Sequence, residues 1–239
     1  MKICIMQPYF FPYVGYFQMI KYVDLFIFYN DVNYIERGWI NRNYILTDKG
    51  KTLFSIPLKK ASSNKIINEV EVLKMEKKYW NVLKTIEFNY SKAPYYNNIF
   101  PLLEDVFNSE ECNTIDKMVR KGIEVTLDYL GINTELIFSS EIDYCHTSSK
   151  VEKLIDIANK TNADTVIFPH GSKQLYSDVD FEKSKIHSLA ITPKFKAYRQ
   201  VNSENKFIEG LSMIDLLMNL SVEQINSLLD DIAFTRLDE

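Results

Sequence analysis

The N-terminal segment places the strongest constraint on the fold of this chain. Residues 3–6 form a short apolar run that is typical of a buried strand, and Pro8 ends it because proline cannot donate a hydrogen bond to a sheet. A loop follows, Gly15 begins a helix that reaches about Tyr22, and the apolar run at residues 25–29 predicts a second buried strand. The order strand, loop, helix, strand predicts the first half of a parallel α/β sheet.

The remaining pattern predicts one α/β domain over residues 1–239. We expect a parallel Rossmann-like sheet flanked by helices, with a helical C-terminal part. A hairpin around the turn at residues 48–50 is expected to be inserted at about residues 40–73, which include a short strand at 69–73. A helical segment is expected at about residues 75–131.

The second half of the sheet is expected to lie towards the C-terminus. A strand at residues 134–138, a helix at 148–159 and a strand at 164–168 return to the α/β pattern. Two final helices are predicted by capping-box patterns, one starting at Ser212 with Asp215 and the other at Ser221 with Gln224.

The charge balance argues against broad binding to nucleic acid. The formal net charge is −4 and the pI is about 5.5. A non-specific interface with a phosphate backbone needs a basic face. We therefore expect no DNA partner.

The cysteines and histidines exclude two classes of small domain. Three cysteines, an odd number with no CxxC pair, indicate a reducing compartment rather than a disulfide framework. No zinc-binding motif occurs, so no metal site is expected.

The N-terminus lacks a secretory signal and no run of about 18 apolar residues exists, so we expect a cytoplasmic protein with no membrane partner.

The loop after the first predicted strand is the first candidate site. Ligands of open α/β sheets bind at the carboxyl ends of strands, and a helix N-terminus favours anions. Gln7, Tyr13, Gly15 and Tyr16 are therefore candidate binding residues, with Gly15 allowing the backbone to approach a phosphate. Neither a dinucleotide-binding glycine fingerprint nor a P-loop is present. The alternative is that residues 10–12 pack the loop and Gly15 lets helix and strand approach.

This loop also resembles the start of the nucleotidyltransferase superfamily, which includes pantothenate synthetases and cytidylyltransferases. There a strand leads into an HxGH motif at a helix N-terminus, and the matching tetrapeptide here is Tyr13-Val14-Gly15-Tyr16. The resemblance implies a nucleotidyltransferase-like (HUP-like) sheet. Both histidines are replaced by tyrosine, which can donate a hydrogen bond to phosphate but carries no positive charge. The replacement counts against adenylyl or cytidylyl transfer.

Charged, aromatic and amide residues gather directly after the second predicted strand, at Asp31, Arg37, Trp39, Asn41 and Arg42. Arginine binds phosphate through two parallel hydrogen bonds, and tryptophan can stack on a base or sugar. Asp31 is a candidate catalytic residue, because a carboxylate could deprotonate an amine or bind Mg²⁺. The alternative is a surface hairpin with an arginine–carboxylate pair and a packed tryptophan.

A third candidate segment, residues 168–178, follows the strand predicted at 164–168. Gly171 begins a Gly-Ser-Lys turn that could wrap a phosphate, and Tyr176 is a further binding candidate. His170 is a candidate catalytic base or acid, with a structural histidine as the alternative.

Taken together, these segments resemble the WbqC-like family of bacterial polysaccharide gene clusters, over nearly the whole chain. The residues that carry the resemblance are the opening at 7–17, Asp24, Asp31, the run at 38–42, Lys150, Gly171, Tyr176, Tyr198, Gln200 and the run at 211–219. The chain has Leu220-Ser221 where the family often has a glycine. The resemblance adds Lys150, Tyr198 and Gln200 to the binding candidates.

The resemblance implies a location in O-antigen or capsule loci and transfer of glycine or another acyl group to an amino sugar. The leading hypothesis is an N-acyl (aminoacyl, including glycyl) transferase or ligase that acts on a nucleotide-linked amino sugar in surface polysaccharide biosynthesis. In this hypothesis Asp31 or His170 accepts a proton from the sugar ammonium group.

The cofactor and the donor stay open in this hypothesis. Either ATP with Mg²⁺ or an already activated acyl donor would serve, aminoacyl-tRNA remains open as a donor, and so does a homodimer. The alternatives are a nucleotidyltransferase that forms a sugar nucleotide and a non-catalytic protein that binds nucleotide sugars.

Overall fold

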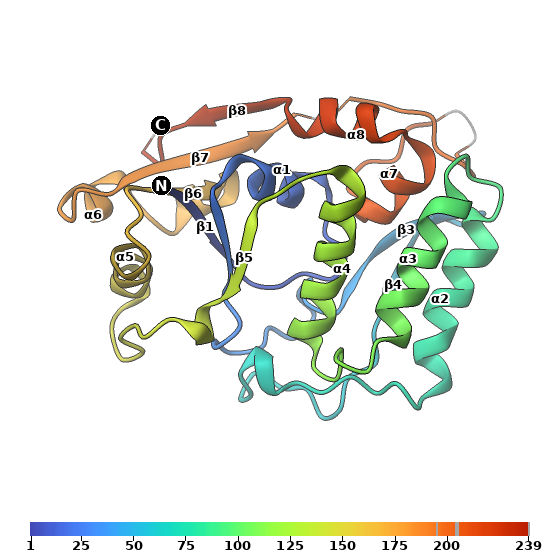
Figure 1. Ribbon diagram of the computed structural model, residues 1–239, viewed down its shortest axis with the longest axis horizontal. Coiled ribbons are helices and arrows are strands. Elements are labelled where there is room, and N and C mark those ends of the chain that lie inside the picture. Colours follow the sequence, from blue (N-terminus) through green and yellow to red (C-terminus); the bar gives the residue numbers. More distant parts are fainter. Residues whose placement is uncertain (195, 204–205, 239) are drawn as a thin grey trace.

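The computed structural model describes residues 1–194, 196–203 and 206–238, and their core is a six-stranded sheet (Figure 1). The strand order is β5-β2-β1-β6-β7-β8, in which the first five strands are parallel and β8 is antiparallel to β7. The strands are β1 (Lys2–Met6), β2 (Leu25–Phe28), β5 (Glu135–Phe138), β6 (Thr165–Pro169), β7 (His187–Pro193) and β8 (Ile232–Thr235). The predicted α/β fold with a largely parallel sheet is confirmed.

The strand order is that of a Rossmann-like sheet. The chain starts at the central strand β1, adds β2 and β5 on one side and then adds β6 and β7 on the other. The direction of growth reverses between β1 and β6, so the carboxyl ends of these two strands flank the topological switch point. In open α/β sheets this is where ligands bind.

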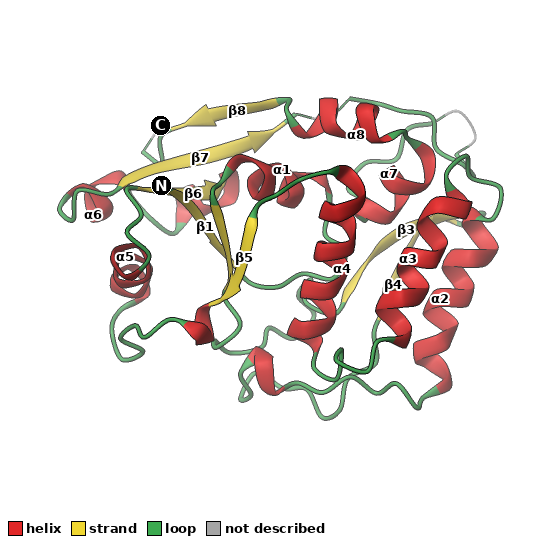
Figure 2. Ribbon diagram, in the orientation of Figure 1, coloured by secondary structure: helices red, strands yellow, loops and turns green. Residues whose placement is uncertain are grey.

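Helices cover both faces of the sheet (Figure 2). Alternate strand residues point to opposite faces: Cys4 and Phe26 pack into one core, and Ile3 and Ile27 into the other. The first core is closed by α1 (Val14–Tyr22), α4 (Ile115–Leu130), α7 (Met213–Asn219) and α8 (Val222–Leu229). The second is closed by α5 (Lys150–Lys160) and α6 (Asp178–Glu182).

The chain between β2 and β5 builds a separate layer beside the sheet. It contains the antiparallel hairpin β3 (Arg42–Thr47) and β4 (Gly50–Ser55), followed by α2 (Lys77–Tyr90), α3 (Tyr96–Asn108) and α4. Helix α4 ends where Gly131 adopts the left-handed conformation with a φ of 69°. The hairpin forms its own two-stranded sheet and does not join the large one.

Two local expectations from the sequence are wrong. Residues 69–73 form no strand: a 3-10 helix, Ile67–Glu69, precedes two isolated bridges, Leu58 with Val72 and Glu71 with Thr114. The capping box at Ser212 does not form. The Asp215 side chain accepts hydrogen bonds from Tyr90, Tyr198 and Gln200 instead of the Ser212 N–H. The capping box at Ser221 is confirmed, since the Gln224 side chain accepts from the Ser221 N–H at 2.9 Å and Ser221 Oγ accepts from the Gln224 N–H at 3.3 Å.

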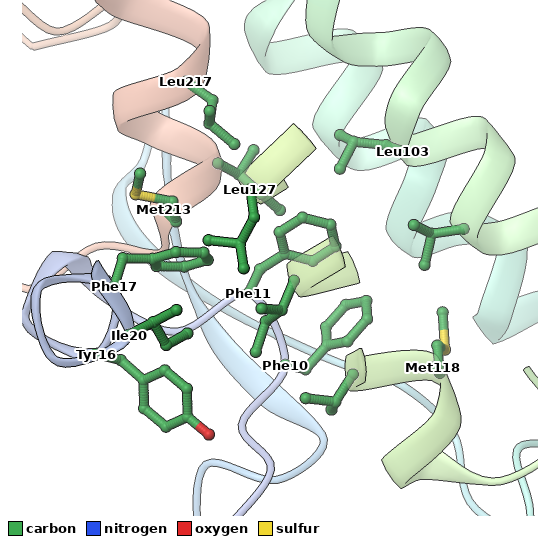
Figure 3. Close-up of a cluster of buried hydrophobic side chains, with 14 of the residues drawn as sticks. Phe10, Phe11, Tyr16, Phe17, Ile20, Leu103, Met118, Leu127, Met213 and Leu217 are labelled. Atoms are coloured by element: carbon green, nitrogen blue, oxygen red, sulfur yellow. The ribbon is translucent and has the colours of Figure 1, made fainter. Parts of the chain in front are cut away.

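The loop that leaves β1 carries two phenylalanines into the core (Figure 3). Phe10 is fully buried, and its ring centroid lies 6.2 Å from those of Phe54 in the hairpin and Phe107 in α3. Phe11 takes a positive φ of 39°, and its ring lies so close to α4 that a Cβ on Gly122 would be 3.1 Å from it. These rings join the sheet to the inserted layer in one continuous core.

No helix among residues 1–194, 196–203 and 206–238 has the length and apolar character needed to cross a membrane.

We expect Phe10→Ala to lower the free energy of unfolding by about 3–5 kcal/mol, because it leaves a cavity where three elements meet. Urea denaturation followed by circular dichroism measures the change. Phe88→Ala is the matched control, since Phe88 is 79% exposed, and it should change stability by less than about 0.5 kcal/mol. Equal losses in the two variants would contradict the joining role of Phe10.

Candidate functional site

Four parallel strands end in one row at the carboxyl edge of the sheet. Strands β5, β2, β1 and β6 each contribute the first residue past their end, and the strand register sets these residues side by side. In sheet order they are Ser139, Tyr29, Gln7 and His170, and we call this row the rim. The Tyr29 N–H donates to the Met6 carbonyl at 2.8 Å, which continues the pairing of β1 and β2 to the rim. Gln7 and His170 flank the switch point.

Asp31 lies beside the Ser139 end of the rim with its carboxylate nearly buried. Its side chain is 8% exposed, and Oδ1 accepts a short hydrogen bond from the Ser139 hydroxyl. Oδ2 is buried and accepts no hydrogen bond from the residues that the structure describes. The Nδ1 atom of His146 lies 3.8 Å from Oδ2. A buried carboxylate oxygen without a donor is costly and rare in proteins, so this atom marks a candidate site.

A buried polar chain holds Asp31 in place from behind. The Asn30 N–H donates to Ser139 Oγ at 3.1 Å, and the Asn30 side-chain amide donates to Asp116 Oδ2 at 2.8 Å. Asp116, at the start of α4, also accepts from the Thr114 hydroxyl at 2.5 Å. Because Asn30, Asp116 and Ser139 are all buried, helix α4 fixes the end of β2 and therefore the Asp31 carboxylate.

Tyr29 and Tyr144 lie beside Asp31, and Tyr176 lies near Tyr29. The Tyr144 ring lies 4.3 Å from that of His146 and 6.4 Å from that of Tyr29. Burial raises the pKa of Tyr29, Tyr144 and Tyr176 above the usual tyrosine value, and the nearby Asp31 carboxylate adds to the shift of Tyr29 and Tyr144. All three phenols are therefore neutral at physiological pH and can donate hydrogen bonds.

His170 lies at the opposite end of the rim from Ser139. Its Nδ1 atom is 2.9 Å from the hydroxyl oxygen of Thr192 in β7, and the side chain is exposed. Two strand spacings, about 10 Å, separate the β2 and β6 backbones. Gly171 follows at an exposed position, where an added Cβ would meet no atom within 4 Å. Of the residues predicted from the sequence, Gln7 and His170 lie in the rim, Gly171 directly follows it, and Asp31 and Tyr176 lie near its Tyr29 member.

The start of α1 is built differently from an open anion site. A Cβ on Gly15 would lie 2.5 Å from the Tyr13 ring, so only glycine lets that ring rest on the first turn of the helix. Tyr16 is fully buried, and its hydroxyl donates to the Gln7 carbonyl at 2.9 Å. Tyr16 therefore positions Gln7. Tyr13 lines a small cavity of about 30 Å³ together with Lys194, Lys196 and Tyr198.

The residues after β2 divide into structural and exposed groups. Asn41 holds the hairpin, since its Oδ1 accepts from the Tyr34 hydroxyl at 2.9 Å and its Nδ2 donates to the Ile56 carbonyl at 2.8 Å. Trp39 is 43% exposed and packs on Tyr44, with ring centroids 5.8 Å apart.

The segment after β2 also contains two arginines and a backbone contact with the loop that leaves β1. Arg42 Nε donates to the Gly38 carbonyl at 2.8 Å, and Arg37 is exposed with a φ of 59°. The Phe10 N–H donates to the Trp39 carbonyl at 3.3 Å, so this segment contacts the loop that leaves β1.

Tyr198 and Gln200 belong to a second buried cluster around Asp215. The Tyr198 hydroxyl and the Gln200 amide donate to Asp215 Oδ2 at 2.6 and 3.0 Å, and the Tyr90 hydroxyl donates to Oδ1 at 2.8 Å. Burial raises the pKa of Asp215 despite these donors. These contacts hold α7 to α2 and to the segment between β7 and α7. Lys150 is the exposed first residue of α5.

Sequence reasoning missed several residues that touch Asp31. Tyr29, Asn30 and Ser139 lie at strand ends, and Tyr144 and His146 lie in the loop between β5 and α5. The available signal was position, because this loop follows the strand predicted at residues 134–138. Its residues therefore lie at the same sheet edge as the three segments already singled out.

Comparison with known proteins places the chain in a family. Residues 7–227 match the profile of the WbqC-like protein family. The chain belongs to this family. The protein of Mycobacterium tuberculosis named "Uncharacterized protein Rv1507c" is 28% identical over 226 residues, which cover 93% of this chain and 95% of that protein. No solved structure matches this WbqC-like protein. The family match begins at Gln7 and contains the whole rim.

Cys145 lies next to His146 in the exposed loop before α5. Hydrogen bonds from the side chains of Ser148 and Thr147 lower the pKa of the Cys145 thiol to about 7, and the Thr147 hydroxyl oxygen lies 3.4 Å from the sulfur. Burial instead raises the pKa of Cys4 and Cys112. The three thiols of this WbqC-like protein therefore differ in the pH at which they react.

We expect Cys145 to be the one fast-reacting thiol of the folded protein, with an iodoacetamide rate that rises through pH 7 because the thiolate is the nucleophile. Peptide mass spectrometry of pH-dependent alkylation measures this rate. Ser148→Ala should move the rise to higher pH, and Ser140→Ala, at an exposed position outside this turn, should not. A rise that stays in place in Ser148→Ala would contradict the assigned cause.

Proposed function

We propose that this WbqC-like protein is an N-acyl transferase or ligase, with glycyl and other aminoacyl groups among its donors, that modifies the amino group of a nucleotide-linked amino sugar. The observation that carries the proposal is the Asp31 carboxylate, which is buried beside the rim and has one oxygen that accepts no hydrogen bond from the described residues. An amino sugar supplies an ammonium group, and a negatively charged carboxylate at this position would attract this cation to the site.

The surroundings of Asp31 support removal of a proton from that ammonium. An amine attacks a carbonyl only as the neutral base, so a proton acceptor must lie at the site. Asp31 offers a carboxylate there, and the neutral phenols of Tyr29, Tyr144 and Tyr176 offer donors for sugar hydroxyls or the acyl oxygen. His170 stands further along the rim as the other proton acceptor considered.

Other residues of the rim and of the segment after β2 support a phosphate-bearing ligand. Gln7 and the open backbone at Gly171 flank the switch point, where nucleotides bind in Rossmann-like sheets. Exposed Trp39 offers a stacking surface, and Arg42 offers guanidinium donors besides the Nε–H that it gives to Gly38. The acyl group would come either from an acid activated by ATP with Mg²⁺ or from an already activated acyl donor. The described residues contain no cluster of three or more metal-ligating side chains.

A nucleotidyltransferase is the second candidate, favoured by the Rossmann-like strand order that begins with a strand–turn–helix unit. Pyrophosphate release from ATP or CTP in the presence of a sugar phosphate, without acyl transfer, would replace the first proposal by this one. Binding of nucleotide sugars without turnover of any donor would instead favour a non-catalytic protein.

We expect Asp31→Asn to slow acyl transfer to a UDP- or dTDP-linked amino sugar by about 10²–10⁴-fold, because the proton acceptor or its support is lost. Mass-spectrometric detection of the N-acylated sugar nucleotide measures the rate, with acyl thioesters, aminoacyl-tRNA and ATP plus free amino acid as donors. Asp48→Asn, at an exposed hairpin turn, is the matched control and should keep the full rate. An unaltered rate in Asp31→Asn would remove Asp31 from the reaction.

We expect Arg42→Ala to abolish the thermal shift that a nucleotide sugar causes in the wild type, since a guanidinium that pairs with phosphate cannot be replaced by solvent. At about 100 times its dissociation constant the ligand stabilises the wild type by about 2.7 kcal/mol. Differential scanning fluorimetry measures the shift, and Arg199→Ala, which removes another exposed arginine, should retain it. A full shift in Arg42→Ala would place Arg42 outside the site.

A further inference from the structure

We propose that His146 is the general base of the site and that Asp31 is the positioning residue that holds its imidazole. The inference rests on the proposed function only for the identity of the proton donor, an amine. It replaces the two acceptors considered from the sequence, Asp31 and His170, by a histidine that no local pattern singled out.

The geometry points to a histidine–carboxylate pair. His146 Nδ1 lies 3.8 Å from Asp31 Oδ2, and that oxygen accepts no hydrogen bond from the residues that the structure describes. The separation exceeds a hydrogen bond, and the pair requires the exposed His146 side chain to move closer to Oδ2 in the free protein. Tyr144 also interacts with the Asp31 carboxylate, so His146 and Tyr144 are both titratable groups beside it. Because burial keeps the Tyr144 phenol neutral, the His146 imidazole is the better proton acceptor of the two.

Asp31 is buried and His146 is exposed, as a positioning residue and a general base should be. The Asp31 side chain is 8% exposed and the His146 side chain 59% exposed. A buried carboxylate held by Ser139 can orient a neighbour but meets substrate poorly. The exposed imidazole packs against the Tyr144 ring with a centroid distance of 4.3 Å and an interplanar angle of 47°. In the proposed pair its Nε2 atom is left for a ligand.

Among the residues that the structure describes, the partner of the His170 ring is a hydroxyl and not a carboxylate. Its Nδ1 atom contacts the neutral hydroxyl of Thr192 at 2.9 Å, and the β6 backbone is about two strand spacings from β2. His187, the remaining histidine, begins β7 and therefore lies at the opposite edge of the sheet from the rim.

The step balances with these groups. The substrate ammonium loses a proton to His146 Nε2, and the freed nitrogen lone pair forms a bond to the acyl carbonyl carbon. The bond between that carbon and the leaving group breaks, and its electron pair departs with the leaving group, which takes the proton from His146. The nitrogen releases its second proton to water as the amide forms.

The ring tautomer tests the pair without any substrate. A hydrogen bond to one imidazole nitrogen decides which nitrogen keeps its proton. In ¹⁵N-histidine-labelled protein, a long-range ¹H–¹⁵N spectrum above neutral pH should show His146 protonated at Nδ1, and Asp31→Ala should shift it to the Nε2-protonated form. The chain has three histidines, so single histidine-to-glutamine variants assign each signal.

Asp143→Ala removes an exposed carboxylate from the same loop and should leave the His146 tautomer unchanged. If Asp31→Ala fails to fold, the wild-type spectrum alone decides: an Nε2-protonated His146 overturns the pair. An equal tautomer in wild type and a folded Asp31→Ala protein overturns it as well.

The activity measurement then separates the inference from the function. His146→Gln should lower acyl transfer by about 10²–10⁴-fold, while His187→Gln keeps the full rate. A loss confined to His170→Gln would assign the base to His170 and overturn the inference. If no donor gives transfer but His146 shows the expected tautomer, the proposed function fails while the Asp31–His146 pair stands.

Discussion

The packing of Phe10 and Phe11 is the interaction on which the rest of the structure depends. These rings come from the loop that leaves the central strand and meet the hairpin, α3 and α4, so the sheet and the inserted layer share one core. In many open α/β sheets such a loop is a polar ligand-binding turn. Here the middle of the loop is apolar, and Gln7 is the polar residue that precedes the two phenylalanines. The Gln7 carbonyl accepts a hydrogen bond from the buried Tyr16 hydroxyl.

The inserted layer supports the candidate site a second time, through polar contacts. Asp116 at the start of α4 binds Asn30, and Asn30 and Ser139 together fix the end of β2 beside Asp31. In the part of the chain that the structure describes, Asn30, Asp116 and Ser139 all have hydrogen-bond partners, whereas the Asp31 Oδ2 atom and the neighbouring Tyr144 hydroxyl have none. Satisfied buried networks rigidify a protein, whereas a buried acceptor without a donor destabilises it. The ligand proposed for this site would supply such a donor.

The sequence predicted the framework of the sheet because its strands are short apolar runs with local signals. β1, β2 and β6 stand out in this way, whereas β7 mixes His187, Ser188 and Thr192 with apolar residues and carries no such signal. Asp31 could be found because it follows a recognisable strand. Its contact with His146 could not, because the two residues lie far apart in the sequence and meet only when β5 pairs with β2. Ser212 and Asp215 show the opposite error, since a local capping pattern concealed a long-range cluster with Tyr90 and Tyr198.

The close contact between Gly122 and Phe11 restricts which amino acids the middle of α4 can accept. The carbonyl of Phe11 accepts hydrogen bonds from Asn43 Nδ2 and Ser212 Oγ, both at 2.7 Å, so displacing this residue would disturb the hairpin and the start of α7 together. Even one methyl group at residue 122 would press on the Phe11 ring from 3.1 Å. Natural variants of the protein should therefore keep glycine at this buried helical position, although helix propensity alone would favour alanine there.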